Sequence, residues 1–315
     1  MSSAIRALGL AGTVGLVALG CGGRAPPLGI LGRNASAAFT PERTVEHRIT
    51  DPRRADAGIS VLWVGHATML VQIDDRFILT DPVFTRFVGQ LSRRLVEPGI
   101  AAEDLPPIDV TVISHMHFDH LSLGSLDRIE DKVRALVVPA GGAAYVPGFS
   151  FPIHQLATWA SVELGDVRVT AVPVDHVGWR YGLDRSWMNA FSGYVIEHHG
   201  KSVYVGGDTA YAREKFLATR GRFPHLDLAL LPISPISPRS FMKHTHTDPH
   251  EAVQAFLDLG AERMVPMHFD TFVNSTDEPG DARRELAREV AARGLEGRVV
   301  VLDIGEQRVL VPRTP

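Results

Sequence analysis

The sequence predicts a layered α/β sandwich within a single catalytic domain. Short apolar runs separated by Gly, Pro and Asp residues follow one another through the first half of the chain, which is typical of consecutive strands. In the second half, strands alternate with helices. This order of elements favours a layered sandwich over a strictly parallel wound sheet.

The strands are expected where apolar residues run together between short breakers. Gly65-His66 and Asp74-Asp75 separate runs at 59–64, 68–73 and 77–80. A run at 109–114 has the apolar character of a buried strand and leads directly into a histidine-rich segment. The remaining strands are expected at 135–138, 167–172, 191–197, 202–205, 226–231, 263–267, 299–302 and 307–311.

Two helices are expected in the second half. The tetrapeptide Asp248-Pro249-His250-Glu251 has the capping-box pattern, with a proline suited to the first helical position. The helix that it begins extends to about Leu259, because Gly260 stops it. Residues 281–293 form a second, amphipathic helix.

Composition sets the broad class of protein. The chain has 315 residues, 45% of them apolar, which is ordinary for a globular protein and sufficient for a substantial core. The formal net charge of −4 argues against a broad nucleic-acid surface, so no nucleic-acid partner is expected.

The N-terminus has the features of an export signal. Arg6 precedes an apolar run at 7–20 that is too short to span a bilayer comfortably but has the length of a signal-peptide core. The run ends in Ala18-Leu19-Gly20-Cys21, which resembles the lipobox of bacterial lipoproteins, and Cys21 is the only cysteine. We therefore expect a lipoprotein exported to the periplasmic or cell-surface side and anchored to the membrane through Cys21. A plain cleaved signal peptide is the alternative.

The remainder of the chain divides into two parts. Residues 22–57 are rich in Gly, Pro, Ala and Arg and are expected to act as a tether. The catalytic domain is expected at 58–315.

The strongest chemical signal is the segment Ser114-His115-Met116-His117-Phe118-Asp119-His120. In extended backbone alternate side chains point the same way, so His115 and His117 can chelate one ion. As the chain then turns, Asp119 and His120 can face a second ion beside it. Imidazole and carboxylate are ligands suited to zinc and related transition metals. The segment therefore predicts a metal site.

Further ligands are expected at the ends of other strands. His176 follows the strand at 167–172, and His268 follows the strand at 263–267. Asp208 comes after two glycines at the end of the strand at 202–205, where glycine allows the backbone to approach a metal closely. Strand ends followed by ligands form a repeated pattern, which predicts a site at one edge of the sandwich.

Several stretches between Trp63 and about Thr276 resemble the metallo-β-lactamase superfamily, and within it the N-acylphosphatidylethanolamine-hydrolysing phospholipase D group. These stretches are Trp63-Val64-Gly65-His66-Ala67-Thr68, Leu79-Thr80-Asp81-Pro82, Leu105-Pro106-Pro107-Ile108-Asp109, the His115–His120 segment, Gly207-Asp208-Thr209, Phe241-Met242-Lys243 and His246-Thr247-Asp248-Pro249. The resemblance implies an αββα sandwich that binds two metal ions, with zinc expected and manganese or iron also used in related folds.

The resemblance also implies a role for each candidate residue. The first ion would be held by His115, His117 and His176, and the second by Asp119, His120 and His268. Asp208 would bridge both ions, and Asp119 would also orient the attacking hydroxide, so these two aspartates are the catalytic candidates. His246 falls where the group places a histidine near the substrate phosphate, although it could equally be satisfied by its neighbours. His66 and Asp81 are expected to hydrogen-bond to ligands.

The expected function is that of a dinuclear metal-dependent hydrolase, most simply a phosphodiesterase of phospholipase D type acting on a lipid or small-molecule substrate. Two ions roughly 3.5–4 Å apart lower the pKa of a water molecule toward neutrality and supply hydroxide. Two alternatives stay open: a lactonase or other ester hydrolase on the same metals, and a non-catalytic metal-binding lipoprotein. The segment 234–241 departs from the group's pattern, so lipid specificity is open. The commonest metallo-β-lactamases have a cysteine where this chain has Asp208, so antibiotic hydrolysis is not expected.

Overall fold

The computed structural model describes Ile30, 32–34, Ala37, 40–46, 48–89 and 92–313. Cys21 and the apolar leader lie outside these residues, so the predicted lipidation site has no structural description. Within the part of the chain that the structure covers, no helix is long and apolar enough to cross a bilayer.

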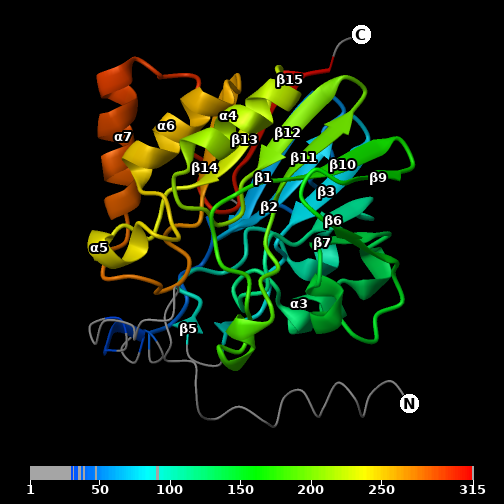
Figure 1. Cartoon of the computed structure of the whole chain (residues 1–315), viewed down its shortest axis with the longest axis horizontal. Coiled ribbons are helices and arrows are strands. Elements are labelled where there is room, and N and C mark those ends of the chain that lie inside the picture. The colour runs from blue at the N-terminus through cyan, green and yellow to red at the C-terminus, as the bar shows by residue number, and fades with distance from the viewer. Residues whose placement is uncertain are drawn as a thin grey trace.

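The fold contains two large β-sheets that face each other (Figure 1). The first sheet has seven strands in the order β15-β1-β2-β3-β6-β7-β8. Their bounds are β15 Gln307–Pro312, β1 Ala57–Gly65, β2 Thr68–Ile73, β3 Arg76–Thr80, β6 Val110–Val112, β7 Leu136–Pro139 and β8 Ile153–Leu156. The strands β1, β2 and β3 form an antiparallel meander, whereas β3, β6, β7 and β8 run parallel.

The second sheet has six strands in the order β14-β13-β12-β11-β10-β9. Their bounds are β14 Arg263–Met267, β13 Leu228–Pro232, β12 Lys201–Val205, β11 Gly193–His198, β10 Val167–Val172 and β9 Ser161–Leu164. The strands β12, β13 and β14 are parallel, so their carboxyl ends lie at one edge of the sheet. A separate two-stranded sheet, β4 Phe87–Val88 with β5 Ser92–Arg93, lies beyond the first sheet.

Helices cover the outer faces of both sheets. On the second sheet, α6 Pro249–Leu259 packs against β13, and α4 Arg213–Arg222 and α7 Asp281–Arg293 lie on either side of α6. On the first sheet, α3 Leu123–Arg128 contributes Leu126 to the core under the outer face. A short helix, α5 Arg239–Met242, precedes α6. The predicted αββα sandwich is therefore confirmed.

Side chains that alternate along β1 show how the layers form. Ile59, Val61 and Trp63 belong to the core between the two sheets, whereas Leu62 and Val64 belong to the core under the outer helices. Successive side chains of a strand point to opposite faces, and both faces of this sheet are covered. A strand buried on both sides needs a continuous apolar run, which is the pattern that its sequence shows.

The element predictions were largely correct, with one clear error. The helices at 249–259 and 281–293 and the strands at 68–73, 167–172 and 263–267 have the predicted bounds. The strand predicted at 299–302 does not form, because only Val299 makes an isolated bridge, to Met264 and Glu296. The elements not predicted are α3, α4, α5, β4, β5, β8 and β9.

Part of the segment expected as a tether contacts the domain. Arg33 donates hydrogen bonds to the carbonyl oxygens of Thr276 and Asp277, and Asn34 donates to that of Val273. The described chain therefore begins beside the 273–278 segment. The role of 22–57 as a tether stays a prediction.

Candidate metal centre

The histidine-rich segment leaves β6 and turns at the edge between the two sheets. The backbone of Ser114 is held by Asp81, whose two carboxylate oxygens accept from the Ser114 amide and hydroxyl at 2.7 Å each. His115 and His120 are almost fully buried, at 1% and 0% exposure. Asp119 is different because its side chain is 27% exposed, so it lies on the open side of the cluster.

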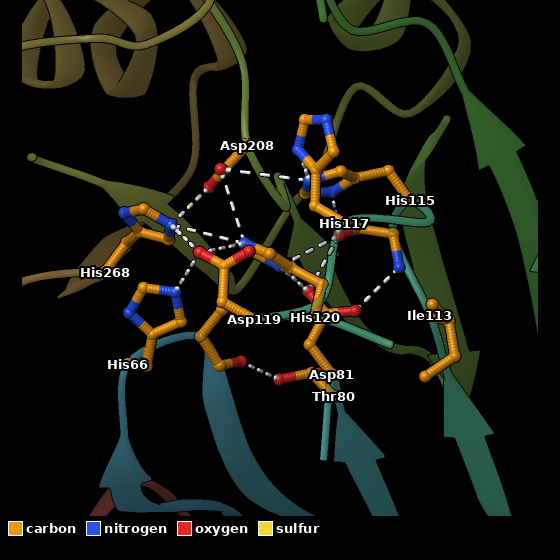
Figure 2. A network of polar contacts seen from close by, with 12 residues as sticks. His66, Thr80, Asp81, Ile113, His115, His117, Asp119, His120, Asp208 and His268 are labelled. Atoms are coloured by element: carbon orange, nitrogen blue, oxygen red, sulfur yellow. Dashed lines mark hydrogen bonds and ion pairs between the residues drawn. The ribbon is translucent and has the colours of Figure 1, made fainter. Parts of the chain in front are cut away.

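The second sheet brings the other candidate ligands to the same place, as Figure 2 shows for Asp208 and His268. Asp208 follows β12, His268 follows β14, and His176 follows β10. All three are buried, at 3%, 1% and 6% exposure. The structure thus brings together all seven residues that the sequence suggested as ligands.

Asp208 lies at the centre of the cluster, and its carboxylate oxygens face histidines from both sheets. Its Oδ1 is 3.0 Å from Nε2 of His268, and its Oδ2 is 3.3 Å from Nε2 of His120. The same Oδ2 is 3.9 Å from Nε2 of His176 and 4.0 Å from Nε2 of His115. A carboxylate so placed can bridge two cations, which is the role expected for it.

The ligand atoms divide into groups that fit two ions. His115, His117 and His176 form one group, and His66, Asp119, His120 and His268 form another, with the ligand atoms of each group within 4.8 Å of one another. Asp208 is grouped with His115 and His120. This division matches the two expected sites, while the ligation itself stays a prediction. His66 is an additional candidate that the sequence assigned only a supporting role.

Several buried nitrogen and oxygen atoms of the cluster have no hydrogen-bond partner among the described residues. They include Nε2 of His117 and Nε2 of His176. In addition, Nε2 of His115 faces Nδ1 of His117 across 2.8 Å, and Nε2 of His268 faces Nε2 of His120 across 3.2 Å. Buried polar atoms are normally paired. Bare atoms that converge in this way fit metal cations, and imidazole with carboxylate is a donor set that suits zinc and related transition metals.

The opposite nitrogen of most candidate histidines is held by the protein. Nδ1 of His176 donates to the carbonyl of Thr245 at 2.9 Å, and Nδ1 of His268 donates to that of Ser234 at 2.9 Å. Nδ1 of His120 contacts Asp81 at 2.8 Å. Such contacts orient metal-binding imidazoles and fix their tautomers. They leave Nε2 free to bind an ion.

His66 and Asp81 each contact a candidate ligand, as expected, while their supporting role stays a prediction. Nε2 of His66 is 3.1 Å from Oδ2 of Asp119, and Oδ2 of Asp81 is 2.8 Å from Nδ1 of His120 (Figure 2). Both residues have left-handed backbone, with φ of 55° and 37°, as does His268 with 68°. Non-glycine residues adopt this conformation only where the surroundings impose it, which is common at functional sites.

Charges within the cluster set the protonation of its members. Burial lowers the pKa of His117 and of His66 to about 3, so both imidazoles are neutral at pH 7 and offer a lone pair. Burial alone would also lower the pKa of His120, but Asp208, Asp81 and Asp119 raise it well above its usual value. The carboxylates therefore require positive charge at this position, which a proton or a metal cation can supply.

Gly207 is required by the packing of two segments. The sequence suggested that the glycines before Asp208 allow the backbone to approach a metal, which stays a prediction. A Cβ on Gly207 would lie 2.3 Å from Cβ of Ser114, and the φ of Gly207 is 57°. Glycine is required here so that the Asp208 loop can pack directly against the start of the histidine segment.

His246 is brought into the site, and the 234–241 segment borders it. Nδ1 of His246 is 3.5 Å from Oδ2 of Asp208 and has no hydrogen-bond partner among the described residues. Its backbone carbonyl accepts from Arg239 at 3.0 Å. Since Ser234 supports His268, both ends of the 234–241 segment are tied to the cluster.

Comparisons with known proteins agree with this site. A family model described as the beta-lactamase superfamily domain matches residues 76–269. The chain is 30% identical to N-acyl-phosphatidylethanolamine-hydrolyzing phospholipase D 1 of Caenorhabditis elegans, over 82% of this chain and 78% of the relative. It is 26% identical to a mitochondrial phospholipase D of the same description from Saccharomyces cerevisiae, over 78% of this chain and 54% of the relative.

A solved structure shows the same fold at low identity. An isothiocyanate hydrolase from Delia radicum gut bacteria superposes with a TM-score of 0.63 at 18% identity, covering 79% of this chain and 98% of that one. The family model covers more than half of the chain, and the C. elegans relative is similar along most of both lengths. Together with the clustered histidines and aspartates, these matches show that the chain belongs to the metallo-β-lactamase superfamily of metal-dependent hydrolases.

Proposed function

We propose that this protein is a dinuclear zinc phosphodiesterase of phospholipase D type. The observation that carries the proposal is the position of Asp208, whose carboxylate oxygens lie within 4.0 Å of five histidines from both sheets. The similarity to two N-acylphosphatidylethanolamine-hydrolysing phospholipases supports the class of substrate. Two divalent ions, when bound, lower the pKa of a water molecule and neutralise charge on a phosphoryl oxygen.

Asp119 is the residue placed to orient the attacking water. Its side chain is 27% exposed, and His66 holds its Oδ2 at 3.1 Å. Burial alone would raise the pKa of Asp119, but His120 and His66 lower it far below its usual value, so it is a carboxylate at neutral pH. A carboxylate fixed on the open side of the cluster can orient a water molecule by accepting a hydrogen bond from it.

His246 is proposed to contact the substrate. It is only 3% exposed, and burial lowers its pKa well below the usual value, so it is neutral. Its unpartnered Nδ1 lies beside Asp208, where the reacting group would have to lie. Arg239 holds the backbone of this residue and also contacts Glu251, which fixes the 234–241 segment against α6.

The cellular setting belongs to the same proposal. The apolar leader and Cys21 support export and lipidation, which would hold the enzyme at a membrane on the periplasmic or cell-surface side. An anchored phosphodiesterase would then meet phospholipids directly. Labelling cells with a radioactive fatty acid tests the anchor: the chain should take up label, and Cys21→Ser should not.

The test of the chemistry is hydrolysis by the full chain loaded with zinc, and separately with manganese. A chromogenic phosphodiester, an N-acylphosphatidylethanolamine, a lactone and an aryl ester are compared at equal concentration. We expect turnover of both phosphodiesters that is abolished in Asp208→Asn. His246→Gln should raise KM for the phosphodiesters more than it lowers kcat.

The other outcomes separate the alternatives. Turnover of the lactone or ester without the phosphodiesters would favour a lactonase or esterase on the same metals. Stoichiometric metal with no turnover of any of the four compounds would favour a non-catalytic metal-binding lipoprotein.

A further inference from the structure

Large apolar side chains stand exposed beside the metal centre. Among the residues that the structure describes, the exposed large hydrophobic side chains are Phe87, Tyr181, Leu183 and Trp187, at 46%, 39%, 68% and 71%. Scattered apolar residues on a surface need no explanation, but a group confined to one place does. We call these four residues the apolar rim.

Phe118 lies between Phe87 and the loop that carries the other three residues of the rim. It belongs to the metal-binding segment itself. It packs against the small apolar cluster of Val83, Val88 and Phe272, next to Phe87. On its other side, its ring lies 5.9 Å from that of Tyr181. Because His117 and Asp119 flank Phe118 in the sequence, the rim lies along the open side of the metal centre.

The loop that carries Tyr181, Leu183 and Trp187 is held firmly in place. Arg180 is 5% exposed and donates to the carbonyls of Met116, within the metal-binding segment, and Leu121, just after it, at 2.9 and 2.8 Å. Its guanidinium also lies 4.2 Å from the ring of Phe118. The contacts of Arg180 therefore attach the loop with the exposed side chains to the metal-binding segment.

Asp184 fixes the turn between the exposed residues. Its carboxylate accepts from the amides of Arg180 and Tyr181 at 2.9 and 2.8 Å, and from the hydroxyl of Tyr145. These bonds hold the short helix η5, Leu183–Ser186, in an orientation that leaves Leu183 and Trp187 in solvent. The exposure is built into the loop by its hydrogen bonds.

The described chain begins on the same side. Asn34 and Ser92 both donate to the carbonyl of Val273, so the N-terminal residues lie next to β5, the partner strand of Phe87. Figure 1 shows the blue start of the described chain, β5 and the lime-coloured loop of η5 at the lower end of the molecule. Eight residues, 22–29, separate Cys21 from Ile30. Whatever their conformation, they reach at most about 30 Å.

We propose that the apolar rim docks on a lipid bilayer and turns the open side of the metal centre toward it. Trp and Tyr favour the boundary between lipid headgroups and acyl chains, and Leu favours the acyl region. Leu183 and Trp187 are exposed by about 70%, which suits a fluid surface that closes around each side chain. A lipid on Cys21 would hold the same side within about 30 Å of the bilayer.

The inference that the apolar rim gives access to phospholipid substrate in the membrane rests on the proposed function. Docking itself requires neither metal nor turnover. It can therefore be measured separately from catalysis.

The test places a fluorescent reporter on the rim. Cys21 is the only cysteine, so Cys21→Ser gives a full chain into which single cysteines can be introduced. Leu183→Cys reports from the rim, and Ala218→Cys, an exposed position on α4, is the matched control. Each is labelled with an environment-sensitive dye and mixed with vesicles of phosphatidylcholine and phosphatidylglycerol, some carrying a lipid-borne quencher.

On protein recovered with vesicles by flotation, we expect the emission of the dye at 183 to shift to the blue. The lipid-borne quencher should also quench this dye. The dye at 218 should stay in water. In the unlabelled chain, Leu183→Ser and Trp187→Ser should each weaken vesicle partition by about tenfold, since about 1.5 kcal/mol of apolar burial is lost. Turnover of a water-soluble phosphodiester should be unchanged in both.

Three results would overturn the proposal. The dye at 183 could remain in water on vesicle-bound protein, or no chain could float at all. The dye at 183 could also be shielded before vesicles are added, which would show that a second copy or the chain's own leader covers the rim. Insertion of the dye without cleavage of any phospholipid would leave the docking surface standing and remove the proposed function instead.

Discussion

The two ends of the β sandwich both collect histidines and aspartates, but they balance the charges differently. At the metal end, Asp208 and Asp119 face imidazoles, and within the described chain no lysine or arginine pairs with either carboxylate. At the opposite end, which we call the hairpin end, the turns after β2, β9 and β11 bring together Asp74, Asp166 and His198.

The hairpin end also has the composition of a metal site. The ligand atoms of Asp74, His198 and His199 lie within 4.8 Å of one another. However, the ammonium of Lys201 is 3.0 Å from Asp74, and the guanidinium of Arg76 is 2.7 Å from Asp166. Protein cations already neutralise these carboxylates. Buried carboxylates without a lysine or arginine partner therefore distinguish the candidate metal centre from the hairpin end, whereas the presence of histidines does not.

Loss of the bridging carboxylate should give the largest difference between the two ends. Asp208→Asn is expected to lower kcat/KM for a phosphodiester by on the order of 10³-fold, because a shared ligand and its charge are removed. Metal content measured by mass spectrometry should fall as well. Asp166→Asn at the hairpin end is the matched control and should change neither quantity by more than about twofold. Equal losses in both variants would contradict the distinction between the ends.

Removal of His66 should have the next largest effect. His66→Ala leaves Asp119 without its partner at 3.1 Å, and we expect a loss of about 10–100-fold in activity or metal affinity. Isothermal titration of the metal-free protein with metal measures the affinity, and steady-state kinetics at saturating metal measures the activity. His198→Ala, which removes a buried histidine at the hairpin end, should leave both unchanged. If His66→Ala lost all metal, His66 would be a ligand in its own right.

Removal of metal should lower thermal stability through the metal end alone. An ion present at 1,000 times its Kd stabilises the folded state by about 4 kcal/mol. For a chain of this size, a chelator should therefore lower Tm by on the order of 5 °C. Asp208→Asn should show little response to the chelator, whereas His198→Ala should respond like the wild type. A reversed pattern, measured by scanning calorimetry, would place the ions at the hairpin end.

The two ends should lose their contributions to the free energy of unfolding at different pH values. Burial lowers the pKa of His117 and His66 to about 3, whereas the unfolded chain titrates near 6.5. Between these values the unfolded state binds more protons, so the metal-free protein should lose stability as pH falls from about 6.5 to about 3. His120, whose pKa is raised, is protonated in both states below about pH 5.5 and adds no slope there, whereas nearer pH 6.5 it contributes a smaller slope of opposite sign.

The hairpin end should respond only at lower pH. Arg76 lowers the pKa of Asp166 from 3.8 to about 2, so the stability from this pair is lost only as pH falls below about 4. Melting curves of the chelated protein from pH 8 to 2 provide the measurement. His117→Gln should flatten the slope above pH 4, and Asp166→Asn should alter only the range below it. A His117→Gln protein with an unchanged slope would contradict the assignment.

Local patterns account for what could be predicted from the sequence. The helix at 249–259 was predictable because Asp248 caps it and Gly260 ends it, with φ of 70°. The helix α4 was missed because it is rich in charged residues and buries little besides Phe216 and Thr219. The strand predicted at 299–302 has the apolar residues of a strand, but within the described structure only Val299 makes bridges there.

The candidate ligands were predictable for a similar reason, since four of them lie within six residues. The contacts that support these ligands were harder to predict from the sequence. The pairing of Nδ1 of His176 with the Thr245 carbonyl and the packing of Gly207 against Ser114 depend on segments that meet only in three dimensions. Exposure of Leu183 and Trp187 could not be predicted either, because apolar residues ordinarily indicate a core.

The first sheet is completed by the last strand of the chain. β15 pairs with β1, so the edge of β1 has no partner until residues 307–312 have been synthesised. Ribosomes deliver a protein from its N-terminus at about 5–20 residues per second. A chain with an export leader would therefore reach the translocation machinery before its first sheet could close. The order of the strands delays closure of the first sheet until residues 307–312 are available, which is compatible with the proposed export of the chain through a membrane.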